Sequence, residues 1–318
     1  MCVLELKELY ELKLQAKEPF NLNLTLSCYS FNWWFNGRAG VIPLLEEPMT
    51  VAVVSGSNLE VEVKVFGVEQ VDVEKQLRWI LGLDEDLSDF YSKVERDPLL
   101  REVPKTLRGM RMRALSPWNA LLVAICQQNA SFMQGWRMLS RIYKLLGAEV
   151  NVEGLKTIIP PGPGKLLSDD AKVKLREAGA GYRAEVIVEA AKRAREGLLK
   201  EASSLSPSRA EDVLREVKGI GSYTARLTLV LSMRMYELLP LDRWLKRLAE
   251  EVYGVEDAEK ELKARWGRWC GLATYFTTVV LDAEVISEAL RRALSGEVKP
   301  KPYVGRPTPL TMWMHEWR

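Results

Sequence analysis

Histidine is nearly absent from this sequence of 318 residues, which contains only His315, close to its end. One histidine excludes a zinc site of three histidines and a Ser-His-Asp triad, and it leaves a Cys-His pair without a plausible partner. Any catalysis must therefore use carboxylates, lysines or hydroxyl groups. Cysteine is also scarce, and Cys2, Cys28, Cys126 and Cys270 lie too far apart for a zinc knuckle or an iron–sulfur cluster. We expect reduced thiols in the core.

Long apolar runs are missing as well. No stretch approaches the roughly 18 residues of a membrane span, and Glu5, Lys7, Glu8 and Glu11 interrupt the region where a signal peptide would be apolar. We therefore expect a cytosolic protein without a membrane partner. Neither sign of charge dominates, because 45 Lys and Arg oppose 43 Asp and Glu. The abundance of these residues over Asn and Gln favours a thermophilic origin.

The N-terminal quarter has the periodicity of β-strands. Polar and apolar residues alternate at 21–27, and two further apolar segments at 51–54 and 59–65 flank the turn Ser-Gly-Ser-Asn. We predict an antiparallel sheet with one solvent-exposed face over residues 1–83.

From about residue 84 the periodicity becomes helical and stays so. The whole chain is therefore predicted to be an α+β protein, with an antiparallel β-sheet domain (1–83), an all-α domain (84–295) and a C-terminal tail (296–318). The expected helices begin after Ser116-Pro117, run over 132–146 before Gly147, cover 172–195 with a break at 179–181, start at a capping box of Ser208 and Glu211, and extend over 271–294.

The tail is rich in proline and tryptophan and includes Met312, Trp313, Met314 and Trp317. It matches no motif. Packing against the rest of the protein is the expected role, and a partner-binding segment is the alternative.

Residues 217–225, Val-Lys-Gly-Ile-Gly-Ser-Tyr-Thr-Ala, lie between two predicted helices. Glycines two residues apart allow the backbone to approach a ligand, and the N–H groups at the start of the next helix favour a phosphate. The segment fits either a hairpin that grips a DNA backbone or a tight helix–helix turn. A dinucleotide-binding loop is disfavoured, because no strand precedes the turn and a third glycine is absent.

A second signal follows at Leu239-Pro240-Leu241-Asp242, where a new helix begins. Asp242 is the expected N-cap residue, and capping alone would account for it. The combination is more specific. A helix-hairpin-helix followed 19 residues after Tyr223 by a Pro-x-Asp helix start resembles the helix-hairpin-helix superfamily of base-excision DNA glycosylases, in which this aspartate is catalytic.

Other segments support the same resemblance, which spans roughly residues 20–294. Residues 116–129 resemble the first conserved helix and its wedge loop, and residues 178–184 resemble the Gly-Tyr-Arg-Ala turn of this superfamily. Residues 20–28 resemble the opening strand of the N-terminal sheet domain shared by 8-oxoguanine and type II 3-methyladenine glycosylases. Relatives with an iron–sulfur cluster lack this sheet, and the cysteines here could not supply one.

The resemblance implies a mechanism. Asp242, held at a helix N-terminus, should be ionised at neutral pH and should stabilise the oxocarbenium-like sugar or orient the attacking water. Extruding a base leaves a hole in the stack, which Asn129, with Gln128 beside it, would fill. For both residues an ordinary polar helix end is the alternative.

The hairpin also has implied contacts. The main-chain carbonyls of Arg215, Val217 and Ile220 match positions that hold a monovalent cation in relatives, so a structural Na⁺ or K⁺ is expected there. The N–H groups of Gly219, Gly221 and Tyr223 would face a phosphate, and Lys218 would add a charge contact.

The chain departs from bifunctional relatives at one decisive position. Where they carry a nucleophilic lysine this sequence has Tyr223, and a phenol cannot form the Schiff base of lyase chemistry. Lys218 and Lys246 are the alternatives, but neither occupies the matching position. The resemblance therefore implies a monofunctional enzyme that uses water.

The lesion is less clearly encoded. At the positions that read 8-oxoguanine in its family stand Cys28 and Thr274, which would not reproduce those contacts. Residues 265–273, Arg-Trp-Gly-Arg-Trp-Cys-Gly-Leu-Ala, resemble the Arg-Trp-x-x-Trp run of type II 3-methyladenine glycosylases, and Trp269 matches their pocket tryptophan. Tyr223 would add a second aromatic ring to the base pocket. Core packing is the alternative for Trp266 and Trp269.

The sequence thus predicts a monofunctional base-excision-repair DNA glycosylase. It would be a monomer that acts on damaged double-stranded DNA of the nucleoid, releases an alkylated purine, and needs no cofactor for catalysis. One alternative is an 8-oxoguanine or hypoxanthine glycosylase with lyase activity. Two others are a non-catalytic helix-hairpin-helix DNA-binding protein, in which Asp242 only caps its helix, and a nucleotide-binding enzyme.

Overall fold

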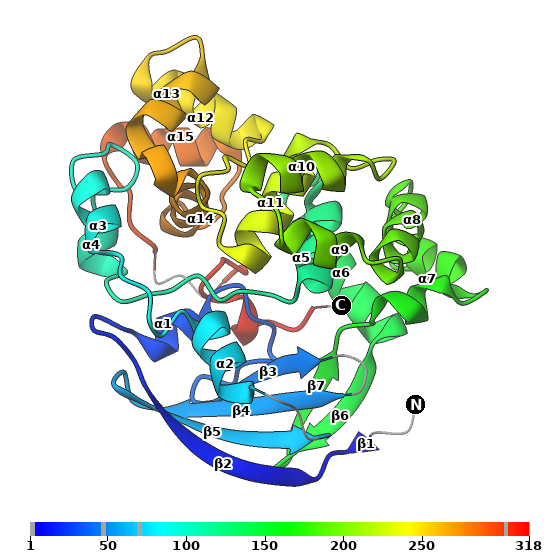
Figure 1. Cartoon of the computed structure of the whole chain (residues 1–318). Helices are drawn as coiled ribbons and strands as arrows, with labels where there is room; N and C mark the ends of the chain where they lie inside the picture. Colours follow the sequence, from blue (N-terminus) through cyan, green and yellow to red (C-terminus); the bar gives the residue numbers. More distant parts are fainter. Residues whose placement is uncertain (1–3, 46–48, 69–71, 302–304, 318) are drawn as a thin grey trace.

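The computed structural model describes residues 4–45, 49–68, 72–301 and 305–317. Its strands form two sheets below a larger group of helices (Figure 1). The strands are β1 (Leu4–Glu5), β2 (Glu8–Gln15), β3 (Gly40–Leu45), β4 (Thr50–Gly56), β5 (Glu60–Gly67), β6 (Ala148–Val152) and β7 (Leu155–Ile159).

The helices fall into two groups that lie above the sheets (Figure 1). Next to the N-terminal sheet lie α1 (Leu22–Ser27) and α2 (Val73–Leu81), whereas α3 (Ser88–Val94) and α4 (Val103–Thr106) lie higher and pack into the core of the other helices (Figure 1). The remaining helices are α5 (Pro117–Gln127), α6 (Phe132–Leu146), α7 (Ala171–Glu177), α8 (Arg183–Arg195), α9 (Leu198–Ser203), α10 (Pro207–Arg215), α11 (Ser222–Met233), α12 (Arg243–Tyr253), α13 (Ala258–Trp266), α14 (Cys270–Val280) and α15 (Ile286–Ser295), with short 3-10 turns η1 (Pro163–Leu167), η2 (Gly267–Trp269) and η3 (Met312–Met314).

The larger sheet is antiparallel, with the strand order β2-β5-β4-β3. One face packs against α1 and α2, where Val61 and Val63 meet Leu26 and Leu77 in a common apolar core. This confirms the predicted antiparallel sheet and the strands expected at 51–54 and 59–65.

The second face of this sheet is not solvent-exposed, contrary to the sequence-based prediction. Val51 and Val53 share an apolar cluster with Val150 and Val152 of the β6–β7 hairpin. This hairpin comes from the segment predicted to be all-helical, and its β6 strand pairs in parallel with β1. Its two-residue turn, Glu153-Gly154, has positive φ angles of 50° and 80°, which suit the right-handed twist of the strands.

The strand predicted at residues 21–27 is wrong, because α1 occupies this segment. The Asn21 side chain accepts a hydrogen bond from the Leu24 N–H at 3.0 Å and caps the helix. Leu22, Thr25 and Leu26 are buried, a spacing that places them on one helical face. The cap and this burial outweigh the polar–apolar alternation.

Most helix boundaries agree with the sequence. Ser116 caps α5 and Gly147 follows α6, while α7 and α8 are separated near the predicted break. The capping box of Ser208 and Glu211 is wrong: α10 begins at Pro207, a favoured first helical residue, after the N-cap residue Ser206, so Ser208 lies inside the first turn. Helix α2, starting at Val73, lies inside the predicted sheet domain.

The single helix predicted over 271–294 is two helices, α14 and α15. Between them Asp282 and Ala283 adopt positive φ angles of 54° and 47°. The Asp282 carboxylate accepts hydrogen bonds from the buried Arg292 at 2.8 Å and from the Lys301 N–H at 3.0 Å, which holds the chain in this turn.

The C-terminal tail runs between the helices and the larger sheet (Figure 1). The Trp313 ring packs against Phe35 at 5.0 Å, and the buried Trp317 packs against Phe31 at 5.7 Å. The predicted packing of this tail is therefore confirmed for both tryptophans.

The predicted buried thiols are confirmed at Cys28, Cys126 and Cys270, which are free. Cys2 lies outside the described residues. In the described part of the chain no helix is long and apolar enough to cross a membrane.

Candidate active site

A cavity of about 740 Å³ lies where α5, α6, α11, α12 and α14 converge. Its lining combines aromatic rings with six charged side chains. The charged residues are Arg113, Asp242, Arg243, Arg247, Glu284 and Arg306.

Asp242 is the N-cap residue of α12, as predicted, and its carboxylate accepts a hydrogen bond from the Leu245 N–H at 2.7 Å. The side chain faces the cavity and is exposed to it. The sequence-based argument stressed the helix N-terminus, which stabilises the anion. Burial by the surrounding protein outweighs the backbone hydrogen bonds, however, and raises the pKa of Asp242 above its ordinary value of 3.8.

Tyr223, in the first turn of α11, lines the same cavity. Burial, followed by the nearby charge of Asp242, raises the pKa of the Tyr223 phenol well above its ordinary value. The phenol is therefore neutral at physiological pH. Thr274 also lines the cavity, but its hydroxyl donates to the Cys270 carbonyl of its own helix at 2.9 Å.

The hairpin between α10 and α11 exposes its main chain. Gly219 has a φ of +92°, and a Cβ atom there would lie 2.5 Å from Val186 Cγ2, so only glycine fits. A Cβ on Gly221 would meet nothing within 4 Å. Within the described residues the N–H groups of Gly219, Gly221 and Tyr223 have no hydrogen-bond partner. Lys218 is exposed beside them.

The segment after α5 packs against this hairpin. The Gln128 amide donates to the Gly219 carbonyl and to Thr224 Oγ1, each at 2.9 Å, and the side chain is buried. The structure therefore places Gln128 as a brace for the hairpin, pointing away from solvent. Asn129 is exposed, with a φ of 45°, and its amide lies 3.4 Å from the Tyr182 hydroxyl.

The expected cation site can be tested by the state of its three carbonyls. The Val217 carbonyl accepts from the Ile220 N–H at 3.0 Å. Across the described ranges, the Arg215 carbonyl accepts no hydrogen bond outside α10, and the carbonyl of the hairpin residue Ile220 accepts none. Two of the three expected carbonyls therefore lack a partner outside a helix, and the monovalent cation stays a prediction. No group of three or more His, Cys, Asp or Glu in the described part of the chain could hold a metal ion.

One end of the cavity is formed by residues that are distant in sequence. Cys28 is 1% exposed and accepts a hydrogen bond from the Tyr275 hydroxyl at 3.0 Å, and burial raises the pKa of its thiol to about 12. Tyr29 stacks on Trp136 at 5.4 Å, and its hydroxyl lies 2.6 Å from Thr278 Oγ1. Motif reasoning found only Cys28 here.

Trp269, predicted to line the base pocket, is not part of the cavity wall. Its indole N–H donates to Asp89 at 2.7 Å, and its ring packs 5.7 Å from Phe90 and 5.9 Å from Tyr236. Trp266 is likewise buried and donates to Asp97. The core-packing alternative describes both residues, and the aromatic wall comes from Tyr29, Trp136 and Tyr275 instead.

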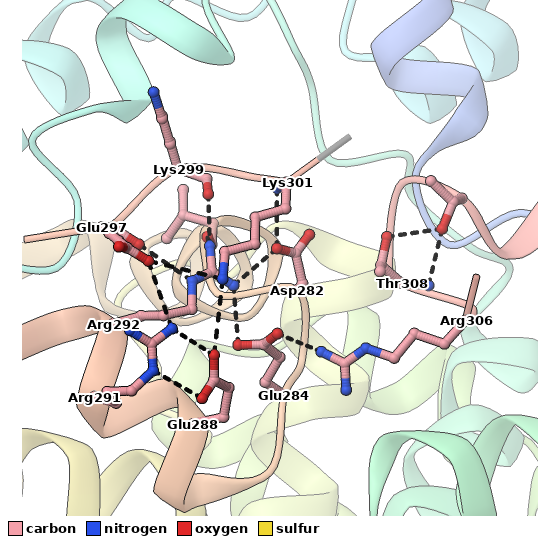
Figure 2. A network of polar contacts seen from close by, with 12 residues as sticks. Asp282, Glu284, Glu288, Arg291, Arg292, Glu297, Lys299, Lys301, Arg306 and Thr308 are labelled. Atoms are coloured by element: carbon pink, nitrogen blue, oxygen red, sulfur yellow. Dashed lines mark hydrogen bonds and ion pairs between the residues drawn. The ribbon is translucent and has the colours of Figure 1, made fainter. Parts of the chain in front are cut away.

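The tail contributes to the cavity through an ion-pair network (Figure 2). Glu284, after α14, lies between Arg292 of α15 and Arg306 of the tail, and both guanidinium groups bond to its carboxylate. Trp244 lies two residues after Asp242, and its indole N–H donates a hydrogen bond to the Glu284 carbonyl at 2.9 Å. Pro309 holds the other end of the cavity, because its carbonyl accepts from the Tyr29 N–H at 2.7 Å. Sequence reasoning missed this role of the tail, since no local motif marks it.

No protein-family model matches the chain. A probable N-glycosylase/DNA lyase of Methanothermobacter thermautotrophicus is 25% identical over 206 residues, which cover 58% of this chain and 66% of that protein. An N-glycosylase/DNA lyase of Saccharomyces cerevisiae is 27% identical over 169 residues, covering 49% of this chain and 45% of that protein. The chain thus spans between about half and two thirds of these relatives.

Solved structures share the fold. An 8-oxoguanine glycosylase/lyase of Clostridium acetobutylicum, in complex with double-stranded DNA containing cytosine opposite 8-oxoguanine, matches with a TM-score of 0.68 at 20% identity, over 86% of this chain and 95% of that chain. A 3-methyladenine DNA glycosylase from Archaeoglobus fulgidus matches with a TM-score of 0.69 at 24% identity, over 84% and 96%. The predicted α+β fold is confirmed, and this chain is similar in sequence to the two N-glycosylase/DNA lyases and in fold to the solved DNA glycosylases.

Proposed function

We propose that this chain is a monofunctional DNA glycosylase that hydrolyses the N-glycosidic bond of a damaged purine extruded from duplex DNA. One observation carries the proposal: Asp242 opens into an aromatic cavity at the N-terminus of α12, and among the described residues no lysine lines that cavity. A carboxylate can stabilise the cationic sugar of the transition state. Without an amine the cavity offers no group for a Schiff base.

The cavity suits an extruded nucleotide. Its volume of about 740 Å³ lies within the range of small-ligand pockets, and the rings of Tyr29 and Trp136 provide a face on which a base can stack. Asp242 would then lie beside the sugar, where its negative charge stabilises the oxocarbenium-like sugar and orients water for attack. Neutral Tyr223 forms part of the wall between base and hairpin.

The hairpin would bind the DNA backbone. Its unpartnered N–H groups at Gly219, Gly221 and Tyr223 can receive a phosphate, and Lys218 adds a positive charge. The free carbonyls of Arg215 and Ile220 would hold Na⁺ or K⁺, which adds positive charge behind the phosphate. Exposed Asn129 is positioned to fill the hole left by the extruded base.

The alkylated purine expected from the sequence loses its main support, because the argument for it depended on Trp269. A glycosylase with lyase activity is the second candidate, favoured by the names of the two relatives. That activity would need a lysine from outside the cavity wall, such as Lys246, whose Nζ lies 3.8 Å from Glu250.

The proposal is tested by comparing the rate of base release by Asp242→Asn with that of the wild type. Duplexes carrying 3-methyladenine analogues, 7-methylguanine, 8-oxoguanine, hypoxanthine or uracil are compared under single-turnover conditions. We expect the variant to lose about 10²- to 10⁴-fold in rate on every duplex that the wild type processes. Asp257→Asn is the matched control, because Asp257 caps α13 in the same way and lies outside the cavity.

The control should keep the wild-type rate. An Asp242→Asn variant with undiminished base release would exclude this catalytic role. A wild type that binds duplex DNA and releases no base would favour the non-catalytic DNA-binding alternative.

A further inference from the structure

Arg113 brings a buried positive charge to the cavity. It lies before α5, is 9% exposed and belongs to the cavity wall. Its guanidinium donates to the Leu26 carbonyl at 3.2 Å and to the Tyr29 carbonyl at 3.4 Å. These two residues flank Cys28, so the guanidinium lies at the end of the cavity that Cys28 and Tyr275 form.

No carboxylate within the described residues forms an ion pair with Arg113. Other buried arginines have such partners: Arg292 pairs with Asp282 at 2.8 Å, and Arg234 pairs with Glu85 at 3.1 Å. Burial without a counter-ion lowers the pKa of Arg113 from its ordinary value, and such burial is costly. The neighbouring Arg111 also bonds only to carbonyls, but it lies outside the cavity wall.

No negative charge from the described part of the chain balances Arg113 at this end of the cavity. Burial raises the pKa values of Cys28 and Tyr275, which are therefore neutral at physiological pH. Glu284 is held by Arg292 and Arg306 at another part of the wall. The remaining carboxylate, Asp242, has the sugar as its proposed target.

We infer that Arg113 determines which base the cavity accepts, an inference that rests on the proposed function. Its guanidinium donates to the acceptor edge of a neutral 6-carbonyl purine, of which hypoxanthine is the simplest example. Arginine forms two hydrogen bonds with the O6 and N7 atoms of such a base. A base with a fixed positive charge, such as 7-methylguanine, meets a like charge there and has its N7 blocked.

The test compares rates of base release for Arg113→Met, Arg113→Lys and the wild type. Three duplexes serve as probes, carrying hypoxanthine, 7-methylguanine or 1,N6-ethenoadenine, which is neutral but lacks the 6-carbonyl group. Each variant is compared with the wild type on the same duplex, so that the intrinsic lability of each bond cancels. Arg111→Lys serves as the control, because Arg111 is buried nearby and does not line the cavity.

For Arg113→Met we expect hypoxanthine release to fall by about 10- to 100-fold relative to 7-methylguanine release. Ethenoadenine release should change little. Arg113→Lys retains the charge, so it should still disfavour 7-methylguanine but should release hypoxanthine more slowly than the wild type. Arg111→Lys should change all three rates by the same factor, as a purely structural residue would.

Equal losses on all three duplexes in both Arg113 variants would overturn this role and leave the proposed function standing. Should Arg113→Met fail to fold, the test uses Arg113→Lys and the same ratio of hypoxanthine release to 7-methylguanine release. Absence of base release from every duplex by the wild type would overturn the proposed function, and this role with it.

Discussion

The two ends of the cavity are built differently. The end that would face DNA consists of the hairpin and the start of α12, where main-chain N–H groups and one N-cap carboxylate would carry the proposed chemistry. The end that would receive the base is assembled from four distant segments, which contribute Cys28 with Tyr29, Arg113, Trp136 and Tyr275.

In the proposed function, one end of the cavity would cleave the glycosidic bond and the other would select the base. The local end can bind a phosphate and stabilise a cationic sugar in any nucleotide, whatever its base. In the proposed function, the end built from distant segments would select the base, through side chains whose positions depend on long-range packing and on the tail. Substitutions at the first end should therefore change the rate on every substrate, whereas substitutions at the second end should change the rate on some bases more than on others.

The largest expected effect concerns the tail network. Glu284→Gln should lower the free energy of unfolding by about 3 kcal/mol, because Arg306 loses its carboxylate partner and the buried Arg292 keeps only Asp282. Glu288→Gln is the control, since the Glu288 side chain is 36% exposed and pairs with the exposed Arg291. It should cost less than about 1 kcal/mol. Equal stability losses in denaturant titrations would contradict the structural role given to Glu284.

A smaller effect is expected in the hairpin. Gly219→Ala should destabilise the protein by about 1–3 kcal/mol, because the left-handed backbone and the contact with Val186 Cγ2 both oppose a Cβ atom. Gly221→Ala has open space and an ordinary φ of −96°, so its stability should equal that of the wild type.

Gly221→Ala should nevertheless weaken binding to duplex DNA, because a Cβ atom would stand between the backbone and a phosphate. The measurements are thermal denaturation and duplex affinity at fixed salt. Wild-type affinity in Gly221→Ala would show that DNA does not approach this backbone.

The smallest expected effect is an increase in stability on replacing Asp242 by asparagine. The pKa of Asp242 is higher in the folded protein than in the unfolded chain, so its stabilising contribution is complete at low pH, below the unfolded pKa. It is lost as the pH rises through the folded pKa. At pH 7 Asp242→Asn should therefore be more stable than the wild type, because asparagine caps a helix equally well.

Asp257→Asn removes a charge from an exposed cap and should show no such gain. Denaturation midpoints measured at pH 7 and below pH 4 give the comparison. An increase in stability of Asp242→Asn that persists unchanged below pH 4 would show that the charge of Asp242 is not its cause.

The sequence predicted the N-cap residues Asp242 and Ser116 correctly, for a physical reason. Hairpin glycines, a Pro-x-Asp helix start and N-cap residues such as Ser116 act within a few residues of themselves, so their spacing encodes their geometry. Errors arose where short patterns competed. At residues 21–27 an alternation concealed the spacing of Leu22, Thr25 and Leu26, and at β6–β7 the turn Glu153-Gly154 was a signal that helical periodicity obscured.

Apart from Cys28, the residues at the other end of the cavity could not be predicted from local patterns. Trp136 has the same apolar spacing as the core residues of α6, and nothing local shows that its ring meets Tyr29. Arg113 resembles any arginine in a basic stretch. Trp269 stands within a recognisable motif, yet its hydrogen bond to Asp89, 180 positions away, turns it from the cavity.

The central claim is that Asp242 acts with water and that no lysine attacks the sugar. The most direct measurement follows strand breakage after complete base release, with and without alkali, and attempts to trap the enzyme on DNA with borohydride. We predict intact strands that break only on alkali treatment, and no trapped adduct. Strand breakage that parallels base release without alkali, together with a borohydride-trapped adduct, would contradict the account and assign the reaction to a lysine.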